Sequence, residues 1–132
     1  MILIRTKQLN EELVSKSFAF SLNVLELYIS LLKKNEFELS KKLLASGTKI
    51  RANIEGSFAS VEKQDFLHNI SLAQKEAIEA RYWLKMVQMK HFISNSCDEC
   101  VEQINEIINI LNYMIQENNK YKIKIDLLHN LN

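Results

Sequence analysis

Two cysteines, Cys97 and Cys100, form a CxxC pair at the start of a predicted helix. The dipole at a helix start lowers the pKa of a thiol, which favours redox chemistry. Redox CxxC motifs follow a strand of a βαβ unit, however, and the sequence predicts no such unit. A zinc site needs four ligands, and the chain has no second CxxC and only three scattered histidines. Both cysteines fall on apolar stripes of their helix, so we interpret them as packing residues. Two free cysteines also fit a protein of a reducing compartment.

Glutamates recur at helical spacing, with Glu76 and Glu79 three residues apart and a further set at Glu99, Glu102 and Glu106. Di-iron helix bundles combine such carboxylates with a Glu-x-x-His motif on two helices, and this motif occurs nowhere in the chain. The sequence also lacks a glycine-rich phosphate loop, a nucleophile elbow and a Walker lysine. We therefore interpret the glutamates as solvated or pairing carboxylates, and predict no enzymatic activity, metal, cofactor or small-molecule substrate.

Four basic residues lie close together at Lys41, Lys42, Lys49 and Arg51. Phosphate recognition needs positive charge clustered on one face. Lys42 and Lys49 are seven residues apart and nearly eclipsed on a helix, with Lys41 about 100° away. These four residues are the candidate nucleic-acid-binding stripe, with the tail lysines as auxiliaries: Lys120, Lys122 and Lys124. A solvated face, or salt bridges between subunits, is the alternative interpretation.

The net charge is only +1, but the charges are unevenly placed along the chain. Residues 1–53 carry nine Lys or Arg against five acids, and residues 54–119 carry five against ten. The last thirteen residues add three lysines and one aspartate. An uneven distribution of charge of this kind can be neutralised within the fold or between subunits, and it does not require a strongly charged partner.

The length of 132 residues, 47% of them hydrophobic, suits a single domain over residues 1–132 with one core. A chain with no proline and only two glycines does not match turn-rich all-β proteins. No segment approaches the ~18 apolar residues of a membrane helix, and the first residues do not resemble a signal peptide. We expect a cytoplasmic protein with no membrane contact.

Hydrophobic spacing predicts four helices, over about residues 11–34, 37–58, 61–90 and 97–118. In the third and fourth helices the apolar residues alternate in steps of four and three, which is a heptad seam. Helices of this length joined by short links predict an all-α fold, an antiparallel up-down-up-down four-helix bundle. The tail over residues 119–132 alternates polar and apolar residues, and it fits either a strand or a continued helix.

Two of these helices carry apolar residues on two faces, which is more than one bundle core needs and therefore indicates oligomerisation. Gly47 lies inside the second helix at a cost of about 1 kcal/mol relative to alanine, so tertiary contacts must hold that turn. The stripe chosen for the first helix is Val14, Phe18, Leu22, Leu25, Tyr28 and Leu32. The predicted core comprises Phe18, Leu22, Leu43, Ile50, Phe66, Ile70, Ala73, Ala77, Leu84, Ile104, Ile108 and Leu111.

A polar row follows the second helix, where Ser46, Ile50, Asn53 and Ser57 are spaced to share one face. A polar row beside an apolar one usually forms a buried hydrogen-bond layer that fixes the register of neighbouring helices. We therefore expect a structural role for this row.

Several blocks of the sequence resemble one known family. They are SGTKIRANIE at 46–55, KQDF at 63–66, AQKEA at 73–77 and EARYWL at 79–84. They resemble the four-helix bundle proteins of intervening sequences in bacterial 23S rRNA genes, often called S23 ribosomal proteins. The resemblance covers roughly residues 9–117, and the order of the blocks makes chance similarity improbable.

The resemblance implies a fold and an assembly more than an activity. Members look like homopentamers of four-helix protomers and are similar to the accessory protein of diversity-generating retroelements, which binds a reverse transcriptase and nucleic acid through a basic surface. Arg51 and Gly56 depart from the family pattern, which commonly has Gly or Pro in place of Arg51 and Glu in place of Gly56. The polar residues of the shared blocks are interpreted as structural: Ser46, Thr48, Asn53, Glu76, Glu79 and Tyr82.

Together, the residues and the resemblance predict a non-enzymatic oligomeric scaffold or binding module, most simply a homopentamer. Its assembly would present a basic surface to RNA, DNA or a nucleic-acid enzyme. The alternative is a purely structural or protein-interaction oligomer with no nucleic-acid role.

Overall fold

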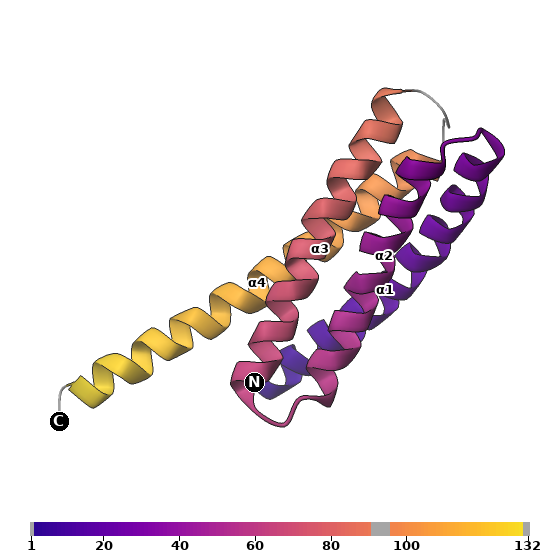
Figure 1. Cartoon of the computed structure of the whole chain (residues 1–132). Helices are drawn as coiled ribbons and strands as arrows, with labels where there is room; N and C mark the ends of the chain where they lie inside the picture. The colour runs from indigo at the N-terminus through magenta and orange to yellow at the C-terminus, as the bar shows by residue number, and fades with distance from the viewer. Residues whose placement is uncertain (1, 91–95, 131–132) are drawn as a thin grey trace.

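The computed structural model describes the backbone of residues 2–90 and 96–130, and the side chains of 7–90, 97–120 and 126–130. Within these residues the chain folds into helices and no strand, so the all-α prediction is confirmed. The helices are α1 (Ile2–Lys33), α2 (Phe37–Ala59), α3 (Lys63–Met89) and α4 (Ser96–Asn130) (Figure 1). None of them, over its described residues, has a stretch apolar and long enough to cross a bilayer.

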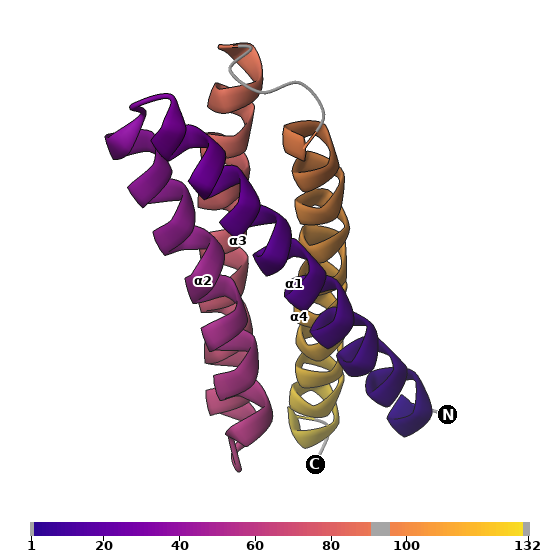
Figure 2. The ribbon, with the colours of Figure 1, turned by 90° about the vertical axis from the view of Figure 1, so that its right-hand side faces the viewer.

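The four helices pack side by side, and α1 crosses α4 obliquely in the view of Figure 2. The link between α1 and α2 is tight because Asn35 adopts a left-handed conformation with φ of 63°. The amides of Asn35 and Glu36 donate to the carbonyls of Leu32 and Leu31, which is the Schellman ending of a helix. Side-chain hydrogen bonds join α3 to α4 with descending partner numbers, so these helices run in opposite directions: Gln74 to Asn112, Arg81 to Asn105 and Gln88 to Asp98.

The core lies where the inner faces of all four helices meet. Three alanines of α3, Ala73, Ala77 and Ala80, are fully buried and let the neighbouring helices approach closely. Most of the predicted core residues are buried as expected: Leu43, Ile50, Ile70, Ala73, Ala77, Leu84, Ile104, Ile108 and Leu111. Phe66 is only half-buried and packs against the edge of the core.

The prediction for α1 was wrong, because Phe18 and Leu22 are 57% and 50% exposed. The buried face of α1 lies on the opposite side and includes one serine. It consists of Leu13, Ser17, Phe20, Val24, Leu27 and Leu31, which we call the inner stripe. The exposed residues Phe18, Leu22, Leu25 and Ile29 form a second series with the same spacing, which we call the outer stripe. Periodicity could not separate the two stripes, since both follow a heptad.

Gly47 of α2 is buried against Val24 of α1. A Cβ atom at this position would be 3.0 Å from Cγ1 of Val24, so the valine side chain would have to shift to admit a larger residue. The turn at Gly47 therefore lies in a tertiary contact. The polar row differs in part from the predicted hydrogen-bond layer between helices. Ser46 and Ser57 are buried as expected, but their hydroxyls donate to carbonyls three or four residues earlier in α2 itself.

Both ends of the bundle differ from the predicted helix boundaries. The first helix begins at Ile2 rather than near residue 11, and α4 continues as a helix through the tail to Asn130. Figure 1 shows the last part of α4 projecting beyond the other three helices. We call residues 119–130 the C-terminal arm; its described side chains are all exposed.

Candidate nucleic-acid interface

Three of the four predicted basic residues lie on the solvent side of α2. Lys41, Lys42 and Lys49 are exposed, whereas the inner side of the helix is buried through residues such as Leu43 and Ile50. Within the described part of the chain, no carboxylate forms an ion pair with any of these three lysines. Their charges are therefore available to a ligand with phosphates.

Lys42 also contacts α3 through an aromatic side chain. Its Nζ atom lies 5.2 Å from the centroid of the Trp83 ring, which is within the range of a cation–π interaction. The Trp83 indole donates to Oε1 of Glu79 over 3.4 Å, and the ring of Tyr82 meets that of Trp83 edge-on at 4.9 Å. The three residues of the YWL block thus have different environments. Leu84 is in the core, Trp83 contacts Lys42, and Tyr82 is exposed.

A hollow of about 300 Å³ lies beside this group, between the start of α2 and the end of α3. Its lining combines apolar side chains with two lysines and two glutamates, so it has no single sign of charge. The lining residues are Glu36, Glu38, Leu39, Lys42, Trp83, Met86 and Lys90. Of the three α2 lysines, Lys42 lines this hollow of mixed charge, together with Trp83.

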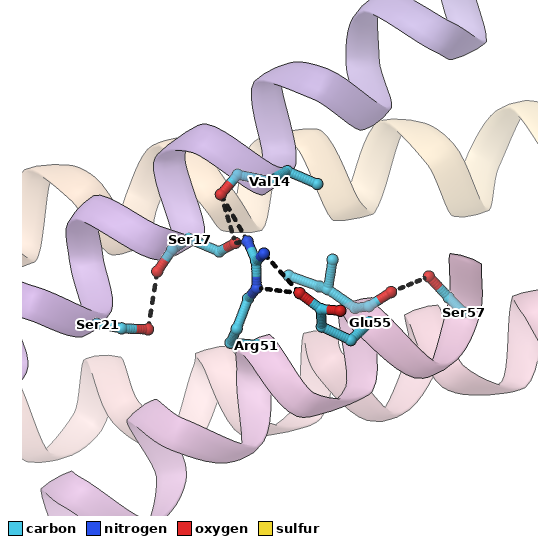
Figure 3. A network of polar contacts seen from close by, with 7 residues as sticks. Val14, Ser17, Ser21, Arg51, Glu55 and Ser57 are labelled. Atoms are coloured by element: carbon cyan, nitrogen blue, oxygen red, sulfur yellow. Dashed lines mark hydrogen bonds and ion pairs between the residues drawn. The ribbon is translucent and has the colours of Figure 1, made fainter. Parts of the chain in front are cut away.

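Arg51, the fourth predicted residue, does not share this face (Figure 3). Its guanidinium points to α1, where Nη1 donates to the Val14 carbonyl over 2.7 Å and to Ser17 Oγ over 3.0 Å. Nε and Nη2 donate to Oε1 of Glu55 over 2.9 and 2.6 Å. Arg51 thus clamps α2 to α1. The sequence contained this signal, because nine residues separate Arg51 from Lys42 and place the two about 180° apart on a helix.

The other polar residues of the shared blocks are spread over several faces. Ser46 is buried, and Thr48 is exposed with its hydroxyl bound to the Leu44 carbonyl of the same helix. Asn53 and Glu76 are half-buried, while Glu79 accepts the bond from Trp83. They form no single cluster.

The auxiliary lysines lie at the other end of the molecule. Lys120 is exposed on the C-terminal arm, 3.6 Å from a carboxylate oxygen of Glu117. The side chains of Lys122 and Lys124 lie outside the described residues. Figure 1 shows the arm and the start of α2 at opposite ends of the bundle, so one chain does not combine the two sets of lysines.

The two cysteines are buried free thiols on the inner face of α4, as predicted for packing residues. Burial raises the pKa of Cys97 to about 11 and that of Cys100 to about 12, with the nearby acidic groups adding to the effect. Both thiols therefore stay protonated near neutral pH. Among the side chains that the structure describes, no three acids, histidines or cysteines gather closely enough to hold a metal ion.

A larger hollow of about 590 Å³ opens between the first part of α1 and the end of α2. Hydroxyl groups and apolar side chains line most of it, with Glu11 as its one acid: Asn10, Glu11, Val14, Ser15, Ser57, Phe58, Ser60 and Phe66. The Oδ1 atom of Asn10 is buried there without a hydrogen-bond partner.

A profile of the 23S rRNA-intervening sequence protein family matches residues 10–113. The chain belongs to this family. The match covers parts of all four helices, while the whole C-terminal arm follows the last matched residue. The family match therefore rests on the helical bundle described above.

The family is also represented among the solved structures that this chain resembles. A crystal structure from Bacteroides thetaiotaomicron VPI-5482, of a protein of unknown function from the S23 ribosomal protein family, superposes with a TM-score of 0.77. The two chains are 29% identical over 82% of this chain and 98% of the other. No curated protein matches the sequence. These likenesses establish the family and the fold.

Proposed function

We propose that this family member is a non-enzymatic, self-associating binding module whose assembly presents the α2 lysines to the phosphates of RNA or DNA. The observation that carries the proposal is the outer stripe of α1. Four large apolar side chains in heptad spacing are about half exposed on one helix face, a pattern typical of a surface that packs against another chain.

The charges support contacts between different faces of neighbouring copies. The outer side of α4 exposes Asp98, Glu99 and Glu102, whereas α2 exposes lysines. A cyclic assembly uses heterologous contacts, in which one patch meets a different patch of the next copy. Five copies is the number that the resemblance to homopentameric relatives implies, and we propose it on that ground.

The exposed lysines of α2 support nucleic acid as the ligand. Contacts made through lysine ammonium groups go mainly to phosphates, so binding tolerates sequence changes and weakens steeply with salt. A ring repeats the modest patch of Lys41, Lys42 and Lys49 once per copy. Because one strand could contact several copies, weak single-site binding becomes useful avidity.

Self-association is tested by light scattering at micromolar protein concentration. The proposal expects a mass several times the 15.4 kDa of the chain, and five times for a pentamer. A mass near 15.4 kDa would contradict it. A salt series then shows whether the charges contribute, because screened surface pairs weaken with ionic strength.

Nucleic-acid binding is tested by anisotropy titrations with a structured RNA and a DNA duplex at about 50 and 200 mM salt. The double variant Lys42→Glu/Lys49→Glu should lose binding. The matched control is Lys75→Glu/Lys85→Glu, which makes the same charge change at two exposed lysines of α3. Absence of binding at low salt, or equal loss in both variants, would remove the α2 lysines as the site. An oligomer that binds no nucleic acid would support the alternative, a protein-interaction scaffold.

A further inference from the structure

The described side chains of the C-terminal arm, those of residues 119–120 and 126–130, are all exposed, so no other helix of the chain covers them. Figure 1 shows the arm leaving the bundle, and Leu127 and Leu128 are 60% and 57% exposed on it. Isolated helices shorter than about 12–15 residues are marginally stable in water, and most helices gain stability by packing an apolar face. A helical arm with exposed leucines therefore calls for a surface that covers them.

The arm continues the inner side of α4. Leu128 follows Met114 by two heptads, and Met114 is 4% exposed in the core. The heptad position that Met114 occupies in the core is thus repeated at Leu128, which is exposed to solvent. A heptad position that is buried in one half of a helix and exposed in the other half suits packing against a further helix.

The outer stripe of α1 is likewise an exposed apolar helix face, and its length is similar to that of the arm. It spans Phe18 to Ile29, about 17 Å at 1.5 Å per residue, and the twelve residues of the arm span about 18 Å. The arm of the same chain does not cover it, because α4 contacts another side of α1. The bonds from Lys16 to Glu106 and from Asn23 to Gln103 mark that contact.

We propose that the outer stripe of α1 receives the C-terminal arm of a second copy of the chain. This inference rests on the self-association proposed above and names the two surfaces that meet. The contact is heterologous, since an arm meets a stripe, so each copy can give its arm to one neighbour and receive an arm from another.

The first test is the double variant Leu127→Asp/Leu128→Asp in the full chain, measured by light scattering. Its matched control is Asn119→Asp/Asn130→Asp, which adds two carboxylates to the same arm at exposed positions. The inference expects the leucine variant to fall to the mass of one chain, 15.4 kDa, and the control to keep the wild-type mass. Circular dichroism verifies that both variants remain helical.

The second test identifies the surfaces by disulfide formation between two different variants. Chains carrying Leu128→Cys are mixed with chains carrying Leu22→Cys, or with chains carrying Ile78→Cys as the control. Ile78 is 45% exposed on α3 and Leu22 is 50% exposed on α1, so their accessibility is similar. The mixed disulfide should form several-fold more with Leu22→Cys. Equal yields, or a Leu128→Cys dimer formed alone, would overturn the inference.

The outcomes separate this inference from the proposed function. A wild-type chain that is monomeric contradicts the proposed self-association itself. A wild-type oligomer whose mass survives Leu127→Asp/Leu128→Asp keeps the proposed function and overturns only the role of the arm. Loss of RNA binding without loss of mass would likewise overturn it, by assigning the arm to nucleic acid.

Discussion

The inner and outer stripes of α1 have the same alternating spacing and nearly the same apolar content, yet they have opposite environments. The large apolar residues of the inner stripe, from Leu13 to Leu31, are at most 1% exposed, whereas the outer stripe is 46–57% exposed. The difference shows that a heptad pattern identifies a helix face that packs, without identifying its partner. The inner stripe meets the same chain, and we propose that the outer stripe meets another.

The largest expected difference between the two stripes is in the free energy of unfolding. Leu27→Ala in the inner stripe removes a fully buried side chain and should cost about 2–5 kcal/mol, because a cavity remains. Leu25→Ala in the outer stripe should change the stability of the isolated chain by no more than about 0.5 kcal/mol. Urea titrations at low protein concentration measure both values. Similar losses would show that the outer stripe is also buried in the isolated chain.

A smaller effect is expected at Arg51, which holds α2 to the carbonyl of Val14 and to Ser17 on α1. Arg51→Met should lower the free energy of unfolding by about 1–2 kcal/mol, because hydrogen bonds from a charged donor are lost. The same variant should leave RNA affinity close to that of the wild type, unlike Lys42→Glu/Lys49→Glu. Weaker RNA binding with unchanged stability would reverse the assignment of Arg51.

The two glycines provide a third comparison between the α1 contact and another surface. Alanine in place of a helix-interior glycine gains about 1 kcal/mol of intrinsic helix stability. Gly56→Ala should realise this gain, since the new Cβ would lie 3.5 Å from Asn69 at ordinary contact distance. Gly47→Ala should realise less of it, because its Cβ would lie 3.0 Å from Val24 on the inner stripe. Thermal unfolding of the two variants decides the point, and equal stabilisation would contradict the close approach.

The smallest effect concerns Lys16, at the edge of α1 that faces α4. The hydrogen bond with Glu106 raises the pKa of Lys16, against a lowering by desolvation. A raised folded-state pKa means that the contribution of this ion pair is complete below about pH 10.5 and lost as the pH rises through the folded value. The pair is partly exposed, so we expect less than about 1 kcal/mol. Unfolding curves of wild type and Lys16→Met between pH 9 and 11.5 should converge as the pH rises.

The sequence predicted the fold well where one helix face was clearly more apolar than the others. In α3 and α4 a single dominant seam led to the correct core residues, such as Ala77 and Ile108. On α1 the choice was wrong, because the outer stripe is uninterrupted while the true inner stripe contains Ser17. That serine is small and polar for a reason visible only in the fold: it accepts a hydrogen bond from Arg51 across the helix pair.

The candidate site was harder to predict, because the charge of a residue does not show to which side of its helix the side chain points. Helical spacing places Lys42 and Lys49 on one side of α2, and the same spacing places Arg51 about 180° from Lys42. The contact between Lys42 and Trp83 joins α2 to α3. It depends on how far one helix is shifted along the other, which a single sequence does not show. The alternating tail allowed a strand, and α4 continues through it as a helix because no glycine or proline interrupts the chain.

The burial of both thiols turns the native cysteines into a reporter of local opening. Alkylating reagents attack thiolates, and Cys97 and Cys100 are fully buried with pKa values of about 11 and 12. Labelling of the native chain must therefore wait for the first turns of α4 to separate from α3, where Cys97 contacts the Leu84 carbonyl. The rate of labelling measures how often this helix end opens, and a cysteine added at the surface reacts on a separate, faster timescale.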